Sequence, residues 1–379
     1  MYSVALGHPA EGRATAPLYL GLSNEFQPGV HGRLLRFDPN GGGFSLLVDL
    51  ARFLPEAGQV LRPPHSKFHL AIAVDSDGVV YAATHVTAPP IGERVHRIYE
   101  IYNDGRRCFS GSHLLRYEPG SGRTVDMGVI CPKEGVRVLA VNPELHELYA
   151  LTYPRDHFVV VTADGEVYDH GRIGQDNSFG LCWCGDGCTY TTDDDGFLVR
   201  YRPGSHSGCG ELERLPVRIP DAPWREGHGN CLRRMVLGPD GMTLFGAGTK
   251  GMRLFSWRPD TGAMRDYGPV AGIDQPGEYA ALPSVKALAF GPDGLLYVVT
   301  VAYSGYARSA DGCRLWRLEP ASGWVEDLGP VGGAQARRFS NCQQAVIGAD
   351  GTLYLGMQTP APPVTMLEWL PTNREGGAG

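Results

Sequence analysis

Three histidines and a lysine gather at the two open ends of one predicted β-hairpin. The stretch HSKFHLAIAVDSDGVVYAATH, residues 65–85, has the pattern of an apolar strand, an Asp-Gly turn and a second apolar strand. His65, Lys67 and His69 lie at its start, and His85 lies at its end. Imidazoles titrate near physiological pH and act as general acids and bases. The open ends of this hairpin are therefore the first candidate site.

The hairpin belongs to a pattern that recurs along the chain. A strand containing Leu-Tyr or a close variant is followed by a loop and by a strand of the Arg-aromatic-acid-Pro type. The first strands are PLYLGLS (17–23), GVVYAATH (78–85), ELYALTY (147–153), GCTYTTD (187–193), GMTLFGAGTK (241–250), GLLYVVTVAY (294–303) and GTLYLGMQ (351–358). Their aromatic positions lie roughly 41 to 68 residues apart, a period typical of propeller blades.

Another apolar strand precedes most of these units and a shorter strand follows, so each unit has four strands. The 52 Gly and 29 Pro agree with many turns, and no helix of useful length is indicated. We therefore predict an all-β fold, a seven-bladed β-propeller of four-stranded antiparallel blades. It would form a single domain over residues 1–371, followed by a flexible tail at 372–379. Residues 1–7 are expected to close the ring by pairing with the last blade.

In such a propeller the inner strands begin, and the second strands end, on the same face. This topology collects distant residues at one mouth. The predicted ligand-binding side chains there are His65, Lys67, Arg137, Arg155, Arg233, Lys250, Lys286, Tyr303, Asn341 and Gln343. The long loop at residues 86–112, rich in Arg and Tyr, would wall a groove beside them. The alternative is a polar channel that holds only water.

The charge of the chain limits the classes of partner that it could bind. The net charge is −7 and no basic block occurs, which argues against nucleic acid and membrane surfaces. A cationic mouth on an acidic protein favours an anionic ligand. The first residues lack the pattern of a signal peptide, so we expect a cytoplasmic protein, or a secreted or periplasmic one whose leader has been removed. The oligomeric state is left open.

The nine cysteines do not have the spacing of a disulfide framework. In CWCGDGC, Cys182 and Cys184 share a strand face and Cys188 starts the next strand. These thiols could bind a structural zinc ion, with His157, His170 or His206 as a fourth ligand, but buried free thiols are the favoured interpretation. The acidic run at 193–196 is interpreted as a turn, with a calcium site as the alternative. No cofactor is expected to be required for catalysis.

Three stretches in order resemble the propeller-fold polysaccharide lyases of the ulvan lyase type. They are KFHLAIAVDSDGVVYAATH (67–85), ELHELYALTYPRDHFVVV (144–161) and YDHGRIG (168–174), and the resemblance is sharpest over residues 61–203. It implies a lyase or a related rhamnosidase acting on rhamnose–glucuronate glycans. Position by position, it implies catalytic roles for His69 or His65, and for His85, Tyr153 and Arg172.

The chemistry that the resemblance implies is β-elimination at a uronic acid in an anionic oligo- or polysaccharide. Arg172, with Lys67 or Arg233, would neutralise the uronate carboxylate. Tyr153 would remove the proton beside the carboxylate and protonate the leaving oxygen, with His85 or His69 as the competing base. Two other functions stay open: a rhamnosidase on glucuronate-linked glycans, and a propeller that binds a glycan or peptide without catalysis. Conventional hydrolysis is disfavoured because carboxylates are sparse at this mouth.

Overall fold

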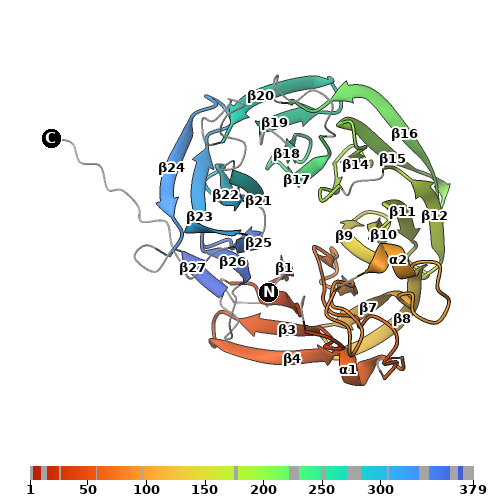
Figure 1. Ribbon diagram of the computed structural model, residues 1–379. Helices are drawn as coiled ribbons and strands as arrows, with labels where there is room; N and C mark the ends of the chain where they lie inside the picture. Colours follow the sequence, from red (N-terminus) through yellow and green to blue (C-terminus); the bar gives the residue numbers. More distant parts are fainter. Residues whose placement is uncertain are drawn as a thin grey trace.

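Antiparallel sheets stand around a central opening, each with one strand at the opening and one at the outer rim (Figure 1). The computed structural model describes residues 3–9, 15–24, 27–56, 58–95, 97–174, 178–221, 230–248, 253–270, 283–304, 307–332, 341–358 and 366–369. The predicted tail at 372–379 lies outside these described residues.

The first three blades contain the strands that carry most of the candidate site. Blade 1 consists of β1 (Ser3–Leu6), β2 (Leu18–Leu22), β3 (Arg33–Asp38) and β4 (Gly43–Asp49). Blade 2 consists of β5 (Ile72–Val74), β6 (Val80–Ala83), β7 (Gly111–Glu118) and β8 (Arg123–Pro132). Blade 3 consists of β9 (Gly135–Asn142), β10 (Glu147–Tyr153), β11 (His157–Val161) and β12 (Val167–Arg172).

The remaining sheets complete the ring. Blade 4 consists of β13 (Cys182–Trp183), β14 (Thr189–Thr192), β15 (Phe197–His206) and β16 (Cys209–Arg218). Blade 5 consists of β17 (Leu232–Leu237), β18 (Leu244–Gly248), β19 (Arg253–Arg258) and β20 (Ala263–Pro269). Blade 6 consists of β21 (Pro283–Phe290), β22 (Leu296–Ser304), β23 (Ala307–Leu318) and β24 (Val325–Pro330). The last sheet consists of β25 (Asn341–Ile347), β26 (Leu353–Gln358) and β27 (Met366–Trp369).

The predicted all-β propeller of four-stranded antiparallel blades is confirmed, but the predicted number of such blades is wrong. The described residues form six four-stranded blades, and the last sheet has three strands among them. The predicted ring closure is also wrong. The N-terminal strand β1 pairs with β2, with Ser3 opposite Gly21, and so supplies the inner strand of blade 1.

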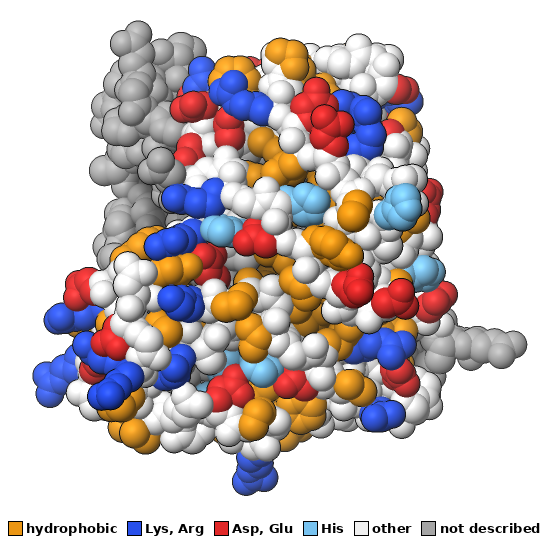
Figure 2. Space-filling model, turned by 90° about the vertical axis from the view of Figure 1, so that its right-hand side faces the viewer, with side chains coloured by type: hydrophobic (Ala, Val, Ile, Leu, Met, Phe, Trp, Pro, Cys, Tyr) orange, Lys and Arg blue, Asp and Glu red, His pale blue; other side chains and the backbone are white. Residues whose placement is uncertain are grey.

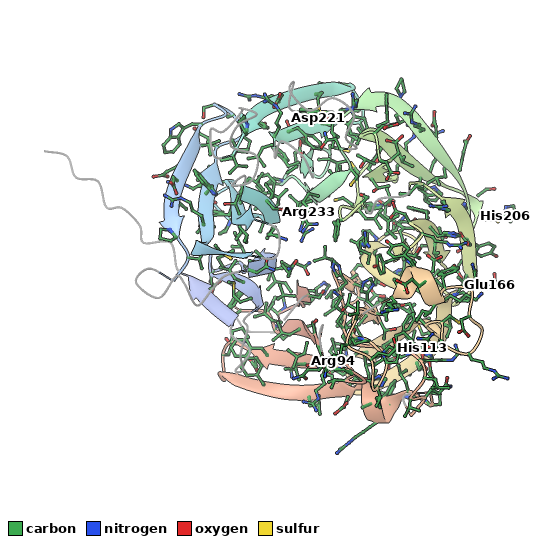
Figure 3. The ribbon with its side chains drawn as sticks, viewed as in Figure 1. Arg94, His113, Glu166, His206, Asp221 and Arg233 are labelled. Carbon is green, nitrogen blue, oxygen red and sulfur yellow. The ribbon has the colours of Figure 1, made fainter. Side chains whose placement is uncertain are left out.

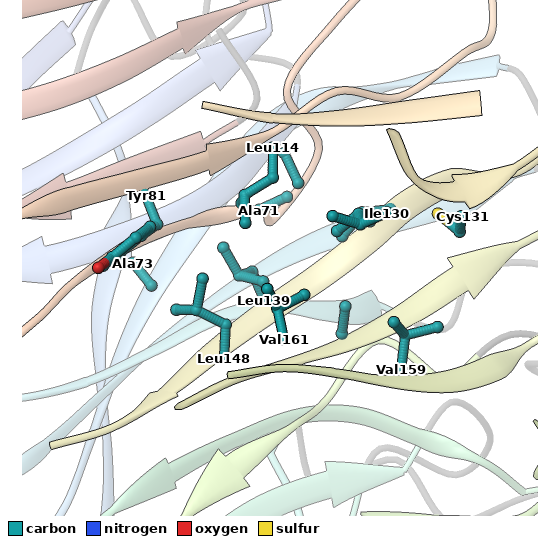
Figure 4. Close-up of a cluster of buried hydrophobic side chains, with 13 residues drawn as sticks. Ala71, Ala73, Tyr81, Leu114, Ile130, Cys131, Leu139, Leu148, Val159 and Val161 are labelled. Carbon is teal, nitrogen blue, oxygen red and sulfur yellow. The ribbon is translucent and has the colours of Figure 1, made fainter. Parts of the chain in front are cut away.

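Apolar side chains fill the seams between neighbouring sheets. Figure 4 shows the seam between blades 2 and 3, where Ala71, Tyr81 and Leu114 of blade 2 meet Leu139 and Leu148 of blade 3. Alternate residues of a strand point to opposite faces, so each blade contributes one face to each of two seams. At the closure, Val4 of β1 packs against Tyr354 of β26. The Val4 amide and the Ser3 hydroxyl both donate hydrogen bonds to Gln344 Oε1 on β25.

Two one-turn helices interrupt the strand pattern, α1 (Leu50–Phe53) and α2 (Ile98–Ile101). Asp49 caps α1 by accepting a hydrogen bond from the Ala51 amide at 3.2 Å. Neither helix approaches the length or hydropathy of a membrane-spanning segment, judged over the described residues. On the side of the ring shown in Figure 2, acidic, basic and hydrophobic side chains are interspersed.

Candidate functional site

Backbone hydrogen bonds attach both ends of the blade 2 hairpin to the inner strand of blade 3. The Leu70 amide donates a hydrogen bond to the Arg137 carbonyl at 2.9 Å, and the Leu139 amide donates one to the Leu70 carbonyl at 3.1 Å. At the other end, the Val136 amide donates to Thr84 at 3.1 Å. His69 and His85, the neighbours of Leu70 and Thr84, are thereby placed beside β9.

Four side chains form a continuous stack at this junction. The rings of His69 and His85 are 5.1 Å apart between centroids, and those of His85 and Tyr153 are 5.3 Å apart. The guanidinium carbon of Arg137 lies 4.6 Å from the centroid of the Tyr153 ring. Tyr99 of α2 contacts the Tyr153 ring edge-on at 5.8 Å, so the long loop at residues 86–112 does border this site. We call His69, His85, Arg137 and Tyr153 the mouth cluster.

Phe179 links the mouth cluster to the central opening. Its ring lies between the guanidinium groups of Arg137 and Arg233, at 4.6 and 4.1 Å from its centroid, both within cation–π range. Figure 3 shows Arg233 projecting into the opening of the ring. Arg137 lies deeper, because 3% of its surface is exposed, whereas Arg233 and Tyr153 are partly exposed. Burial lowers the pKa of Arg137 to about 10, although the charge of Asp156 opposes this shift.

His69 is held as a neutral imidazole with a defined tautomer. Its Nδ1 atom lies 2.9 Å from the carbonyl oxygen of Arg137, which can only accept a hydrogen bond. Nδ1 therefore carries the proton, and Nε2 keeps its lone pair. Burial lowers the pKa of His69 well below its usual value, and the charges of Lys67, His85 and Arg137 add to the effect. His69 thus has the form of a base rather than of an acid.

Across the channel, Arg234 ties the inner strands of the opposite blades together. Its side chain donates to the carbonyl oxygens of Lys286 on β21 and Gln343 on β25, at 2.5 and 2.8 Å. Burial and the charges of Arg233 and Arg234 lower the pKa of Lys286 well below its usual value. Asn341 begins β25 on the same side of the channel. Three of the predicted ligand-binding residues, Lys286, Asn341 and Gln343, therefore lie on the inner strands of neighbouring sheets.

A buried carboxyl group lies below the mouth cluster. Asp156 is 1% exposed and follows the Tyr153–Pro154 peptide bond, which is cis. Burial raises the pKa of Asp156 to about 6, and the charge of Arg137 works against the rise. An alanine side chain at Gly174 would approach both Asp194 Oδ1 at 2.5 Å and Asp156 Oδ2 at 3.1 Å, so the two carboxyl groups are near neighbours.

Several predicted residues lie away from the mouth cluster. Arg172 ends β12, the outermost strand of blade 3, two strand spacings or about 10 Å from β10. Its side chain bonds to the carbonyl oxygens of Arg155 and Gly174 at 2.9 and 3.3 Å. The guanidinium of Arg155 covers the ring of Tyr102 at 3.9 Å instead of approaching Tyr153. The structure thus places Arg137, not Arg172 or Arg155, against the tyrosine.

Of the other predicted residues, one is joined to the mouth cluster through its backbone and one lies in a separate cluster. Lys67 is buried and pairs with His85 through the backbone, its amide and carbonyl bonding at 3.3 and 2.8 Å. The ring of His65 contacts Glu56, Ser110 and Thr84, in a separate cluster. Lys250 lies outside the described residues, and Tyr303 belongs to β22 with a side chain that is likewise outside them.

The cysteine stretch packs as part of a hydrophobic seam. Cys184 and Cys188 are buried and Cys182 partly so, in the cluster between blades 4 and 5. The Cys182 and Cys184 thiols each lie 3.3 Å from a backbone carbonyl oxygen, of Trp183 and Met242 respectively. Burial raises the pKa of these two thiols to about 12 and about 11. In the described residues the acidic run at 193–196 is a turn, in which Asp193 accepts from the amides of Asp195 and Phe197.

Three contributors to the site were not assigned to it from the sequence. Phe179 lies in an apolar run, Tyr99 in the long loop, and Asp156 among several acids in loops. The signal that could have found Tyr99 is the length of its loop, residues 86–112. Phe179 has no such signal, because it lies in an apolar run and its amide pairs with the Leu232 carbonyl.

Comparisons with known proteins identify the fold. No protein-family model and no curated protein matches the chain. Among solved structures, virginiamycin B lyase from Staphylococcus aureus is similar over 79% of this chain and 83% of that one, with 13% identity and a TM-score of 0.50. A 6-phosphogluconolactonase-like protein from Bacteroides uniformis is similar over 96% and 94%, with 13% identity and a TM-score of 0.53. The GH74 enzyme of Niastella koreensis is similar over 93% of this chain and 51% of its own, with 12% identity and a TM-score of 0.56. These neighbours include a lyase and a glycosidase, and at such identities they share the propeller fold alone.

Gly135 is required by the close approach of His85. A Cβ atom at this position would lie 2.7 Å from His85 Nδ1 and 3.1 Å from its Cα. We expect Gly135→Ala to displace His85 and to lower the free energy of unfolding by about 1–3 kcal/mol. Urea denaturation measures this effect. The control is Gly120→Ala, where a Cβ meets nothing within 4 Å; equal losses in the two variants would contradict the steric explanation.

Asp156 should make stability depend on pH in a defined direction. Its pKa is about 6 in the folded protein against 3.8 ordinarily, so the folded state binds the proton more tightly. Stability therefore falls as the pH rises from about 4 to about 6. Asp156→Asn removes this titration, and asparagine tolerates the positive φ of 58° found here.

The measurement is the unfolding free energy of both proteins at several pH values. Between pH 4 and pH 7.5, the unfolding free energy of Asp156→Asn should rise relative to that of the wild type by up to about 3 kcal/mol. Asp164→Asn, at an exposed turn residue, is the control. A difference between wild type and Asp156→Asn that is constant with pH would show that Asp156 does not titrate in this range.

Proposed function

We propose that the protein is a lyase that cleaves a uronate-containing glycan by β-elimination at the mouth cluster. The observation that carries the proposal is the stack of Arg137, Tyr153 and His85, whose neighbours meet at 4.6 and 5.3 Å. It combines a phenol, an imidazole and a guanidinium, the groups that this reaction needs. The resemblance to propeller-fold lyases of the ulvan lyase type supports it, and rhamnose–glucuronate glycans are the proposed substrates.

The uronate carboxylate is the group that makes the reaction feasible. Removing the proton on the carbon beside it leaves negative charge that the carboxylate must share, so cations have to neutralise it. Arg137 and Arg233 flank Phe179 at the mouth. The Arg137 Nη1 atom has no hydrogen-bond partner among the described residues. A buried donor of this kind suits a ligand carboxylate oxygen.

Tyr153 is the proposed proton-transfer residue. As a phenolate it would take the proton from the carbon beside the carboxylate. The carbon–oxygen bond of the neighbouring glycosidic linkage then breaks as a carbon–carbon double bond forms, and Tyr153 returns the proton to the leaving oxygen. The Arg137 guanidinium against its ring stabilises negative charge on the phenol. His69, whose proton lies on Nδ1, and His85 are the competing bases.

The carboxylate set argues against ordinary hydrolysis at this site. A pair of carboxyl groups must flank the scissile bond in most glycosidases. Asp156 and Asp194 lie together beside Gly174, and neither carboxyl group is part of the ring stack of His85 and Tyr153. A screen of acidic glycans separates the functions. A lyase produces an unsaturated uronate that absorbs ultraviolet light, a rhamnosidase releases rhamnose without new absorbance, and a binding propeller does neither.

The first test removes the Tyr153 hydroxyl. Tyr153→Phe keeps the ring stack and should lower turnover by roughly 10²–10⁴-fold, because proton transfer is lost. Ultraviolet absorbance measures turnover, and thermal unfolding checks that the fold is kept. Turnover like that of the wild type in a folded Tyr153→Phe protein would remove tyrosine from the mechanism and leave His69 or His85 as the base.

The second test decides which arginine binds the carboxylate. Lysine cannot reproduce the planar fork of arginine, so Arg137→Lys should lower kcat/KM roughly 10- to 100-fold. Arg172→Lys tests the position that the family resemblance implies, and Arg123→Lys, at an exposed site at the start of β8, is the matched control. Arg137→Lys should also weaken binding of the uronate glycan, and this loss of affinity should shrink for a carboxyl-reduced glycan, which can be bound but not cleaved. If only Arg172→Lys lowered kcat/KM, Arg172 on the outer strand β12, and not Arg137, would be the residue that binds the carboxylate.

A further inference from the structure

Outside the mouth cluster, three side chains of the kind that ligate metals converge on blade 2. Glu56 follows α1, His65 precedes the hairpin, and His113 lies in β7. Glu56 Oε1 lies 2.5 Å from His113 Nε2 and 3.3 Å from His65 Nε2. One candidate ligand atom from each residue lies within 4.8 Å of the other two. Figure 3 shows His113 well away from the central opening.

Neighbouring groups orient both imidazoles. Asp126 on β8 lies 2.8 Å from His113 Nδ1, and because a carboxylate only accepts, Nδ1 carries a proton there. His65 Nδ1 lies 3.0 Å from the Thr84 hydroxyl. In both rings the second nitrogen, Nε2, therefore faces the Glu56 carboxylate. Metal-binding histidines are characteristically held by their other nitrogen in this way.

The cluster is accessible on one side. A small pocket with a cavity volume of about 10 Å³ has Glu56, His65 and Ser110 in its wall. His65 and His113 are 1% and 6% exposed, and the pocket reaches the cluster at Glu56 and His65. The Ser110 hydroxyl lies 3.0 Å from His65 Nε2 in the wall of this pocket. Three protein ligands and an open position are typical of zinc sites that bind water or a substrate.

We propose that Glu56, His65 and His113 bind a divalent transition-metal ion, with Zn²⁺ the ion that this ligand set suits best. Asp126 is the positioning residue for His113. Two atoms that each lie about 2.0–2.1 Å from a tetrahedral zinc ion are about 3.3 Å apart. The His65–Glu56 separation already has that value, and the His113–Glu56 pair needs to open by under 1 Å. In chemical terms, the ion replaces the proton shared between His113 and Glu56. This proposal does not rest on the proposed lyase activity.

The test measures zinc binding to the full chain after treatment with a chelator. Isothermal titration with Zn²⁺ should show one site per chain, and bound zinc should raise the melting temperature. His113→Ala and the conservative Glu56→Gln should abolish this site. Asp126→Asn should weaken binding by roughly 10- to 100-fold, as outer-shell partners of metal-bound histidines do.

Two controls make the result specific. His146→Ala removes another histidine whose Nδ1 lies 2.8 Å from an aspartate, Asp75, and it should bind zinc like the wild type. Nine free cysteines could also take up metal. Substitution with Co²⁺ distinguishes them, since thiolate ligands give a strong near-ultraviolet charge-transfer band. No zinc uptake by the wild type, equal uptake in His113→Ala, or a thiolate band would each overturn the proposal.

Discussion

The candidate site depends on the backbone hydrogen bonds that join the blade 2 hairpin to β9. Leu70 exchanges bonds with Arg137 and Leu139, and Thr84 accepts from Val136. Apolar side chains also fill the seams between neighbouring sheets, and their packing is not directional. Hydrogen bonds fix register to within a fraction of an ångström. They therefore determine that two histidines of one blade meet an arginine and a tyrosine of the next.

The same junction concentrates positive charge inside an acidic protein. Arg137 and Lys67 are buried there and Arg233 adjoins them, while the chain as a whole carries −7. Burying cations is unfavourable unless counter-charges or hydrogen bonds compensate. Phe179 compensates in part through its ring face, and Asp156 through its carboxyl group. An anionic ligand at the mouth would complete the compensation, which is the electrostatic reason to expect a uronate rather than a neutral sugar.

The sequence predicted those features that follow from local pattern and blade topology. The strand repeat determined the propeller class, and the rule that inner strands begin where second strands end brought His85, Tyr153 and Arg137 to one place. Features that depend on packing across the molecule were not predicted. The pairing of β1 with β2 and the outward position of Arg172 depend on which strand a segment joins. Glu56 and His113 are 57 residues apart, and no spacing rule relates them.

The two histidines at the start of the hairpin illustrate this limit most clearly. His65 and His69 both match the first histidine of the lyase pattern, and the sequence cannot separate them. In an extended chain four residues span about 13 Å, so the two imidazoles cannot serve one small site. In the structure His69 lies in the mouth cluster, and His65 lies with Glu56 and His113. Lys67 lies between them and pairs with His85. One extended segment therefore carries a ligand-binding candidate at each end, and restraining His65 through a metal ion would also restrain the strand that presents His69.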